Sequence, residues 1–134
     1  MSVVFQRSSL KKIAVFIQDF QDAAARQGFI VHNRETMNLA ETFYKHGVTV
    51  GDNFDVHMLH LCKPAKAAAS LSTNPERAPL MPKFVIAFTR DDETQIRYFG
   101  LDEELVRELV DDPDFPTSLG ETQAAIRNLI DEAA

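Results

Sequence analysis

The sequence predicts an α+β fold with a largely antiparallel sheet, and two observations carry this prediction. Strand-like and helix-like patterns are both present, but the strands gather in the middle of the chain and beyond instead of alternating regularly with helices. Two of them, Lys83–Thr89 and Thr94–Phe99, flank a short polar connection that is typical of a β-hairpin. At 134 residues the chain has the length of one domain, so we expect a single domain over 1–134.

The first part of the chain predicts a short strand followed by a long helix. Residues 3–6 have a strand pattern, and Ser8 or Ser9 is suited to cap a helix that runs to about Gln27. Gly28 then stands where a left-handed helix end favours glycine. The apolar face of this predicted helix is formed by Leu10, Ile13, Ala14, Ile17 and Ala24.

Two strands and two helices are predicted in the next part. Phe29–His32 is a short apolar strand, and Met37–His46 has helical spacing and is followed by a glycine. Phe54–Cys62 is the longest strand, and its side chains alternate between two faces. Pro64 suits the first turn of a helix that ends near Leu71, because the N–H that proline lacks would have no helical partner there.

The remaining segments predict a loop, a short helix and a closing helix. Ser72–Pro82 contains three prolines and is predicted to be a loop. Asp102 is placed to cap a short helix, and Ser118 with Glu121 has the spacing of a capping box that opens the last helix. The apolar face of that last helix is formed by Ile126, Leu129, Ile130 and Ala133.

The aromatic residues divide into two groups. Most lie at core spacing in a predicted strand or helix and are expected to be buried, namely Phe16, Phe20, Phe29, Phe84 and Phe88. The spacing does not decide the positions of Phe43, Phe54, Tyr98 and Phe99. If several of the second group are exposed together, they would mark a surface for dimerisation or for a partner.

The composition argues against several classes of protein. The net charge is −6, and the 14 Lys and Arg residues form no dense basic tract, so we expect no nucleic-acid partner. No apolar run approaches the roughly 18–20 residues that span a bilayer. The first residues also lack the order of a secretory signal, so we expect a cytoplasmic protein with no membrane contact. The single cysteine excludes a disulfide within the chain and a zinc site with several thiolates.

The junction between the longest strand and the helix opened by Pro64 is the main candidate for chemistry. Cys62 lies just before the helix N-terminus and next to Lys63 and Lys66, features that stabilise a thiolate. His60 shares its strand face, about 7 Å away between Cα atoms. A thiolate assisted by this imidazole is one interpretation. A small buried cysteine beside a hydrogen-bonded histidine is the alternative that the residue types favour.

The same junction offers a candidate anion site. Lys63, Lys66 and Lys83, with the N–H groups of the helix opened by Pro64, could hold a carboxylate or a phosphate. Pro64 itself removes one of those donors, and the chain has no glycine-rich phosphate loop. The alternative is a set of solvated lysines on an acidic protein. The sequence does not show whether Lys83 lies next to Cys62.

A metal or haem site has only partial support. His60 and Cys62 are weak candidate ligands, whereas a structural zinc site usually takes four. His57 is expected on the opposite face of the strand, and His32 and His46 are isolated in the sequence. Further ligands would have to come from elsewhere in the chain or from a second chain.

No complete catalytic set is recognisable. The acidic runs stand at predicted turns or helix starts, where capping and solvation explain them. The serines lack the flanking glycines of a nucleophile elbow. The acidic runs are Asp91-Asp92, Asp102-Glu103-Glu104 and Asp111-Asp112.

Several short motifs occur in a distinctive order along nearly the whole chain. They are Gly28-Phe29-Ile30-Val31, Cys62-Lys63-Pro64-Ala65, Pro75 and Leu80-Met81-Pro82, the last leading into Phe84-Val85-Ile86. A closing amphipathic helix follows them. In this order and spacing, the chain resembles the small prokaryotic domain-of-unknown-function family 302.

The resemblance implies a fold and leaves the function open. The implied fold is α+β of the TATA-binding-protein-like type, a curved antiparallel sheet with helices packed on one face. It does not carry over the DNA binding of that protein, and the family has no established activity. The family often has a second cysteine directly after the Leu-x-Pro turn, where this chain has Lys83. A dithiol formed with Cys62 is therefore excluded here.

These observations lead to three hypotheses on function. We expect a non-catalytic ligand-binding or interaction domain that acts as a homodimer, because a small domain with free sheet edges is stabilised by association. A ligand would lie between the Cys62–Lys66 junction and the Leu80–Lys83 turn. The second hypothesis is a sulfur-handling or redox protein that uses Cys62 with His60. The third is a metal or haem binder.

Overall fold

The computed structural model describes residues 2–134 and shows one open five-stranded sheet. All neighbouring strands are antiparallel, in the order β1-β5-β4-β3-β2. The strands are β1 (Ser2–Ser9), β2 (Ile30–Val31), β3 (Val56–Cys62), β4 (Lys83–Arg90) and β5 (Glu93–Leu101). The helices are α1 (Ile13–Arg26), α2 (Leu39–Lys45), α3 (Pro64–Thr73), the 3-10 helix η1 (Pro75–Leu80), α4 (Glu103–Leu109) and α5 (Phe115–Ala133).

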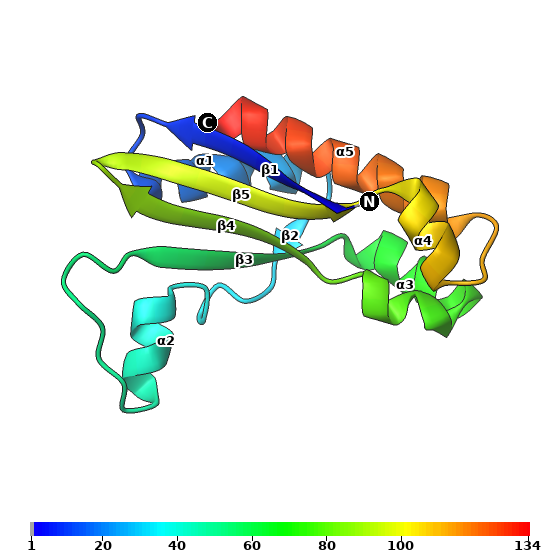
Figure 1. Cartoon of the computed structure of the whole chain (residues 1–134), viewed down its shortest axis with the longest axis horizontal. Coiled ribbons are helices and arrows are strands. Elements are labelled where there is room, and N and C mark those ends of the chain that lie inside the picture. Colours follow the sequence, from blue (N-terminus) through cyan, green and yellow to red (C-terminus); the bar gives the residue numbers. More distant parts are fainter. Residues whose placement is uncertain (1) are drawn as a thin grey trace.

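The long helices cover one face of the sheet. In Figure 1, α1 and α5 lie against the sheet, α3 and α4 lie at the end where β3 and β5 finish, and α2 projects beyond β3. This arrangement confirms the predicted α+β fold with an antiparallel sheet and helices packed on one face. Within residues 2–134, no helix combines the length and the apolar character needed to cross a membrane.

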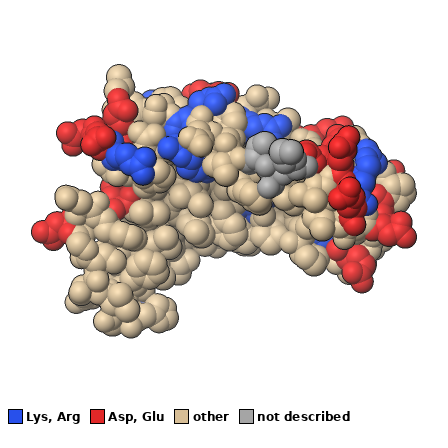
Figure 2. All heavy atoms as spheres, viewed as in Figure 1, with Lys and Arg blue, Asp and Glu red and all other residues tan. Residues whose placement is uncertain are grey.

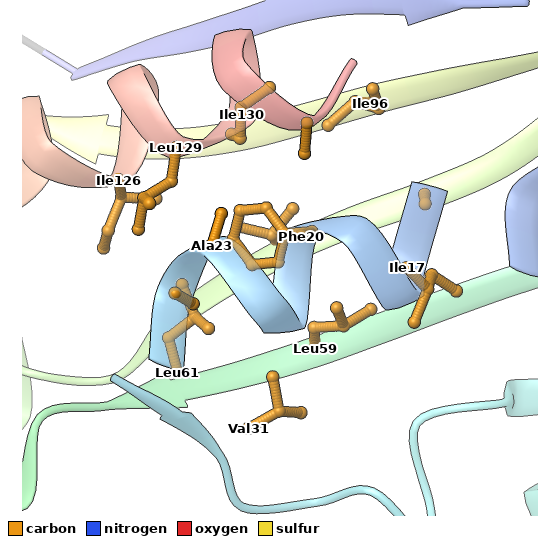
Figure 3. Close-up of a cluster of buried hydrophobic side chains, with 14 of the residues drawn as sticks. Ile17, Phe20, Ala23, Val31, Leu59, Leu61, Ile96, Ile126, Leu129 and Ile130 are labelled. Atoms are coloured by element: carbon orange, nitrogen blue, oxygen red, sulfur yellow. The ribbon is translucent and has the colours of Figure 1, made fainter. Parts of the chain in front are cut away.

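The core lies between the sheet and the helix pair α1–α5. Because alternate residues of a strand point to the same face, Leu59 and Leu61 of β3 and Val85 of β4 all point into this layer and are almost fully buried. Phe20 of α1 and Ile126 of α5 meet the strand residues from the helix side (Figure 3). The amphipathic pattern of the closing helix therefore predicted its buried face correctly.

β4 and β5 confirm the predicted hairpin, with a tighter turn than the predicted connection. Arg90 pairs with Glu93, so only Asp91 and Asp92 remain between the strands. Both aspartates have positive φ, 53° and 62° respectively. Two successive positive φ values are those of a type I′ turn, whose twist matches the twist of the flanking strands.

The predicted start of the first long helix is wrong. Ser8 and Ser9 belong to β1, where Ser9 pairs with Thr94 of β5 and its hydroxyl donates a hydrogen bond to the carbonyl of Ala134 at 2.7 Å. The helix begins only at Ile13. Pairing along the whole edge of β5 outweighs the local capping preference of two serines. Leu10, expected on the buried helix face, is consequently 86% exposed.

The predicted start of the last helix is also wrong. α5 begins at Phe115, before the expected capping box, so Ser118 lies inside the helix. The carboxylate of Asp112 accepts hydrogen bonds from the backbone N–H groups of Asp114 and Phe115 at 3.1 and 2.9 Å. This acidic side chain therefore serves the helix start in the role that was expected of Ser118 and Glu121.

Residues 72–82 are not the simple loop that was predicted. They contain the end of α3 and the whole of η1. Asn74 stands between the two helices, and its side chain accepts a hydrogen bond from the backbone N–H of Glu76 at 3.1 Å. Proline fits the first turn of a helix because its missing N–H has no partner to lose there, and Pro75 occupies that position.

The other predicted elements are present with shifted ends. α2 lies within its expected range, and α3 begins at Pro64 as expected but continues two residues beyond Leu71, to Thr73. Asp102 caps α4 by accepting a hydrogen bond from the N–H of Leu105 at 2.9 Å. Gly28 adopts the expected positive φ, 82°, after α1. The strand predicted over Phe29–His32 is reduced to the two residues of β2.

The sheet face opposite α1 and α5 carries many apolar side chains. Phe84 and Phe88 were expected in the core, and this expectation is wrong, because strand alternation places Val85 and Ala87 on the helix side instead. Tyr98, by contrast, is buried in the core. The apolar residues that share this outward register are Val4, Val56, Met58, Phe84, Ile86, Phe88 and Phe99, and the polar residues Gln6, Gln95 and Arg97 lie among them on the same face.

Candidate functional site

A cavity of about 230 Å³ lies at the end of the sheet where β3 finishes and β4 begins. α3, the end of η1 and the first turns of α5 form its other walls. Most of the wall is apolar, and this part comes mainly from Phe29, Leu71, Met81, Phe115 and Leu119.

Every candidate site residue from the sequence lines this one cavity. His60, Cys62 and Lys63 come from β3 and its junction with α3, because the strand leads directly into the helix. Lys66 is in the first turn of α3, and Lys83 is the first residue of β4. The antiparallel pairing of β3 with β4 brings Lys83 beside Cys62, a proximity that the sequence could only suggest.

Lys83 is a largely buried cation. Its ammonium donates a hydrogen bond to the carbonyl of Met81 at 2.6 Å. Burial lowers the pKa of Lys83 below its ordinary value, since a charged group is poorly solvated there. The Cys62 sulfur acts in the opposite direction and raises this pKa, and the charge of Lys66 lowers it. The pKa is lowered overall, so burial and the charge of Lys66 together outweigh the favourable interaction of the ammonium with Cys62.

The other two lysines have partners but no counter-ion. Lys66 donates a hydrogen bond to the Thr122 hydroxyl at 2.7 Å, and the Lys63 ammonium lies 5.2 Å from the centre of the Phe29 ring. Within residues 2–134, none of the cavity lysines forms an ion pair with an Asp or Glu. The cavity therefore holds positive charge that the described part of the chain does not neutralise.

His60 is held in a stack of rings. Its ring centre lies 4.3 Å from that of His32 and 4.5 Å from that of Phe84. His32 is isolated in the sequence, and the pairing of β2 with β3 brings it to this site. Burial lowers the pKa of His60, and the charges of His32 and Lys83 lower it further. The neutral imidazole is therefore favoured, and no hydrogen bond joins it to Cys62 within the described residues.

The described residues contain no group of three or more His, Cys, Asp or Glu side chains placed to hold a metal ion. His57 points to the face opposite His60, as expected, and its Nε2 lies 2.8 Å from Asp55 Oδ1. His46 ends α2, outside the cavity lining. The weak metal candidates His60 and Cys62 are thus brought together without a full ligand set from this part of the chain.

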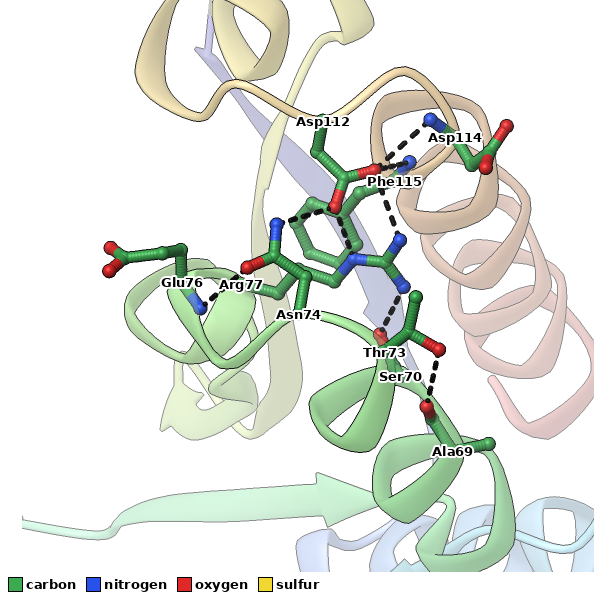
Figure 4. Close-up of polar contacts among 9 residues, drawn as sticks. All are labelled: Ala69, Ser70, Thr73, Asn74, Glu76, Arg77, Asp112, Asp114 and Phe115. Carbon is green, nitrogen blue, oxygen red and sulfur yellow. Dashed lines mark hydrogen bonds and ion pairs between the residues drawn. The ribbon is translucent and has the colours of Figure 1, made fainter.

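Two residues that sequence reasoning missed hold the outer wall of the cavity. Arg77 of η1 and Asp112 form a buried ion pair with contacts of 2.6 and 3.0 Å (Figure 4). Arg77 also donates a hydrogen bond to the Ser70 hydroxyl at 3.1 Å and lies over the Phe115 ring. Ser70 and Phe115 both line the cavity. The contacts of Arg77 with Ser70, Asp112 and Phe115 therefore hold the α3 wall of the cavity in place against its α5 wall.

A second hollow, of about 560 Å³, lies between β1, the end of β5 and α5. Two of its polar side chains already have partners within the chain. Gln123 donates a hydrogen bond to the Leu101 carbonyl and accepts one from the Leu101 N–H, at 2.6 and 2.8 Å. Arg7 pairs with Asp131. The smaller cavity, with its uncompensated charge, is the better candidate for a binding site.

Comparison with known proteins identifies the family. Residues 5–133 match the family model described as domain of unknown function DUF302. The chain belongs to the DUF302 family. A solved structure of an uncharacterized conserved DUF302 protein from Bacillus stearothermophilus is similar, with a TM-score of 0.78 at 16% sequence identity over 98% of each chain. At this identity the likeness shows the fold alone. No curated protein matches the chain.

The DUF302 identity gives particular interest to Lys83. The family resemblance implies a frequent second cysteine at this position, close to the position of Cys62. In this chain the position is occupied by the partly buried Lys83, which lines the same cavity as Cys62. The site of this chain therefore combines one thiol with one buried cation, and its chemistry has to be argued from that pair.

Proposed function

We propose that this DUF302 protein is a non-catalytic domain that binds a small anionic ligand in the cavity at the end of its sheet. The observation that carries the proposal is the uncompensated charge of Lys66 and Lys83 in a mostly apolar cavity. Charged side chains that are withdrawn from water are normally paired, because an unpaired buried charge is costly. An anion is the partner that would neutralise them.

Binding is favoured over catalysis by the state of the titratable groups. His60 is stacked between two rings and makes no hydrogen bond to Cys62 within the described residues, so it is not placed as the base of a nucleophile. The cavity otherwise offers lysines, hydroxyls and apolar side chains. This set recognises a ligand but has no evident pair of acid and base.

The second candidate function is sulfur handling or redox chemistry at Cys62. Its support is the position of Lys83 and Lys66 near the sulfur, because neighbouring cations stabilise the thiolate that such chemistry requires. With a single cysteine in the chain, any resolving thiol would belong to another molecule. A free thiol of this kind also suits the cytoplasm, the location we propose.

The open face of the sheet supports the proposal that the protein acts as a homodimer. Phe99 and Val4 on this face are 59% and 50% exposed. In the view of Figure 2, the surface over β3 and α2 is largely free of charged side chains. A second copy could cover the same patch, as the two-fold symmetry of a dimer requires, and would withdraw these aromatic and aliphatic groups from water.

The ligand-binding proposal is tested by filling the cavity. Ala67 lines the cavity, whereas its neighbour Ala68 is exposed on the outer side of α3 and gives a matched control. Native mass spectrometry should detect a dissociable ligand on the wild type and on Ala68→Phe but not on Ala67→Phe. If no ligand is retained on purification, a thermal-shift screen of small carboxylates and phosphates should stabilise the first two proteins only.

Two results would decide against this function. Equal ligand retention by Ala67→Phe and the wild type would place the binding outside the cavity. A mass that survives denaturation and maps to the Cys62 peptide would favour the thiol function instead. Circular dichroism of both variants checks that they keep the native fold.

A further inference from the structure

We infer that the cavity ligand is a small amphipathic monocarboxylate, held by Lys83 and Lys66 at its charged end and packed against Leu71, Met81 and Leu119 along its apolar part. This inference rests on the proposed ligand-binding function and adds the chemical class of the ligand. It follows from the distribution of charge in the cavity, from the number of free donors and from the size of the space.

The charged groups of the cavity act on one another. Lys83 at the start of β4 interacts electrostatically with Cys62 and Lys66, and its charge also acts on His60. These residues belong to the adjoining ends of β3 and β4 or to the first turn of α3. One anionic group could therefore interact with both Lys83 and Lys66.

Apolar groups line the same cavity as these cations. Leu71 follows Lys66 by five positions in α3, which corresponds to roughly 7–8 Å along the helix axis. Met81 follows η1, and Leu119 lies in the second turn of α5. A ligand that satisfies both kinds of group must combine one anionic head with an apolar body.

The donors suit a carboxylate better than a phosphate. An ammonium has three N–H donors, and Lys83 and Lys66 each use one, on Met81 and Thr122. The remaining donors can serve the two oxygens of a carboxylate, whose single charge is easily neutralised here. A phosphate carries more charge and more acceptor oxygens. The chain offers it no glycine-rich loop, and Pro64 lacks one N–H at the start of α3.

The volume indicates the size of a ligand that would fill the cavity. One water molecule occupies about 30 Å³ in the liquid, so a cavity of about 230 Å³ holds on the order of eight non-hydrogen atoms. A six-carbon carboxylate has this size. Hexanoate is therefore the probe of choice, with 1-hexanol as a neutral analogue of nearly equal length and inorganic phosphate as a purely anionic competitor.

Isothermal titration calorimetry with these three probes tests the inference. Hexanoate should bind the wild type more tightly than 1-hexanol does, and phosphate should not displace it. Lys83→Met keeps the side-chain length and removes the charge, so it should weaken hexanoate binding on the order of tenfold or more and leave 1-hexanol binding unchanged or stronger. Lys45→Met, on the exposed surface of α2 and outside the cavity lining, should bind both probes as the wild type does.

The possible failures can be told apart. If hexanoate and 1-hexanol bind equally and Lys83→Met changes neither, the cavity binds apolar ligands and the carboxylate inference is wrong. If phosphate displaces hexanoate, the anion class is wrong. If no probe binds the wild type, and Ala67→Phe also leaves the thermal-shift screen unchanged, the ligand-binding function itself fails.

Discussion

At the scale of single residues, two cations at the cavity differ in their partners. Arg77 is buried and has a carboxylate partner, Asp112, and the pair is further satisfied by Ser70 and Asn74. Lys83 is partly buried, donates a hydrogen bond to a backbone carbonyl, and forms no ion pair with an Asp or Glu within residues 2–134. A buried ion pair fixes the position of the elements that carry it, whereas a cation without a counter-ion favours the binding of an anion. We therefore expect Arg77 to support the cavity wall and Lys83 to attract the proposed ligand.

Removing the carboxylate of Asp112 should destabilise the protein in a pH-dependent way. Asp112→Asn leaves Arg77 buried without a counter-charge, so its melting temperature should fall well below that of the wild type at pH 7. Arg77 keeps the pKa of Asp112 far below its ordinary value of 3.8. The stabilisation is therefore present above that pH and is lost as pH falls through the lower folded value. Thermal unfolding should be followed by circular dichroism at pH 7 and at successively lower pH. The difference in melting temperature between the wild type and Asp112→Asn should narrow only in strong acid.

Glu103→Gln provides the comparison for this experiment. Glu103 forms an exposed ion pair with Arg107 four residues later, and such pairs contribute little to stability. The melting temperature of Glu103→Gln should stay close to that of the wild type at every pH of the series. Equal melting temperatures for Asp112→Asn and Glu103→Gln would show that the buried pair does not support the fold.

At the scale of secondary-structure elements, the β4–β5 hairpin carries avoidable strain. Asp91 and Asp92 both adopt positive φ, a conformation that glycine adopts freely and that costs a residue with a Cβ atom more. Replacing the pair by Asn-Gly should raise the free energy of unfolding by about 1 kcal/mol in urea denaturation, because this dipeptide prefers the type I′ turn. Asp92→Ala removes a charge and keeps the strain, so it should not stabilise. If Asp92→Ala stabilised the protein as much as the Asn-Gly replacement does, the gain in stability would come from the loss of charge and not from the relief of strain.

Three predicted helix starts show which local signals can be trusted. Asp102 was recognised correctly because nothing competes with it for the start of α4. Ser9 was misassigned because a distant strand, β5, recruits it into a ladder, and Ser118 because a residue six positions earlier, Asp112, already supplies the helix start. Local capping preferences amount to about 1 kcal/mol, so strand pairing and a buried ion pair outweigh them.

At the scale of the whole molecule, the uncovered sheet face should control the oligomeric state. Phe99→Glu places a charge within the proposed contact and should weaken dimerisation on the order of a hundredfold or more, because an unpaired buried charge is costly. Leu109→Glu changes an apolar residue of similar exposure on α4, 55% against 59% for Phe99. Size-exclusion chromatography with light scattering should show dimers of the wild type and Leu109→Glu, and monomers of Phe99→Glu. A monomeric wild type, or a dimer that persists in Phe99→Glu, would remove the proposed interface.

The sequence by itself determined the α+β class, the hairpin, the family and the residues around Cys62 that line the candidate site. These features follow from hydrophobic period, turn chemistry and motif order, all of which are properties of neighbouring residues. Only the tertiary structure decided that Lys83 and His32 meet the Cys62 junction, that Arg77 pairs with Asp112, and that Phe84 and Phe88 face outward. Each of these depends on the register between distant strands or on packing between distant helices, and no short-range pattern in the chain encodes such pairings.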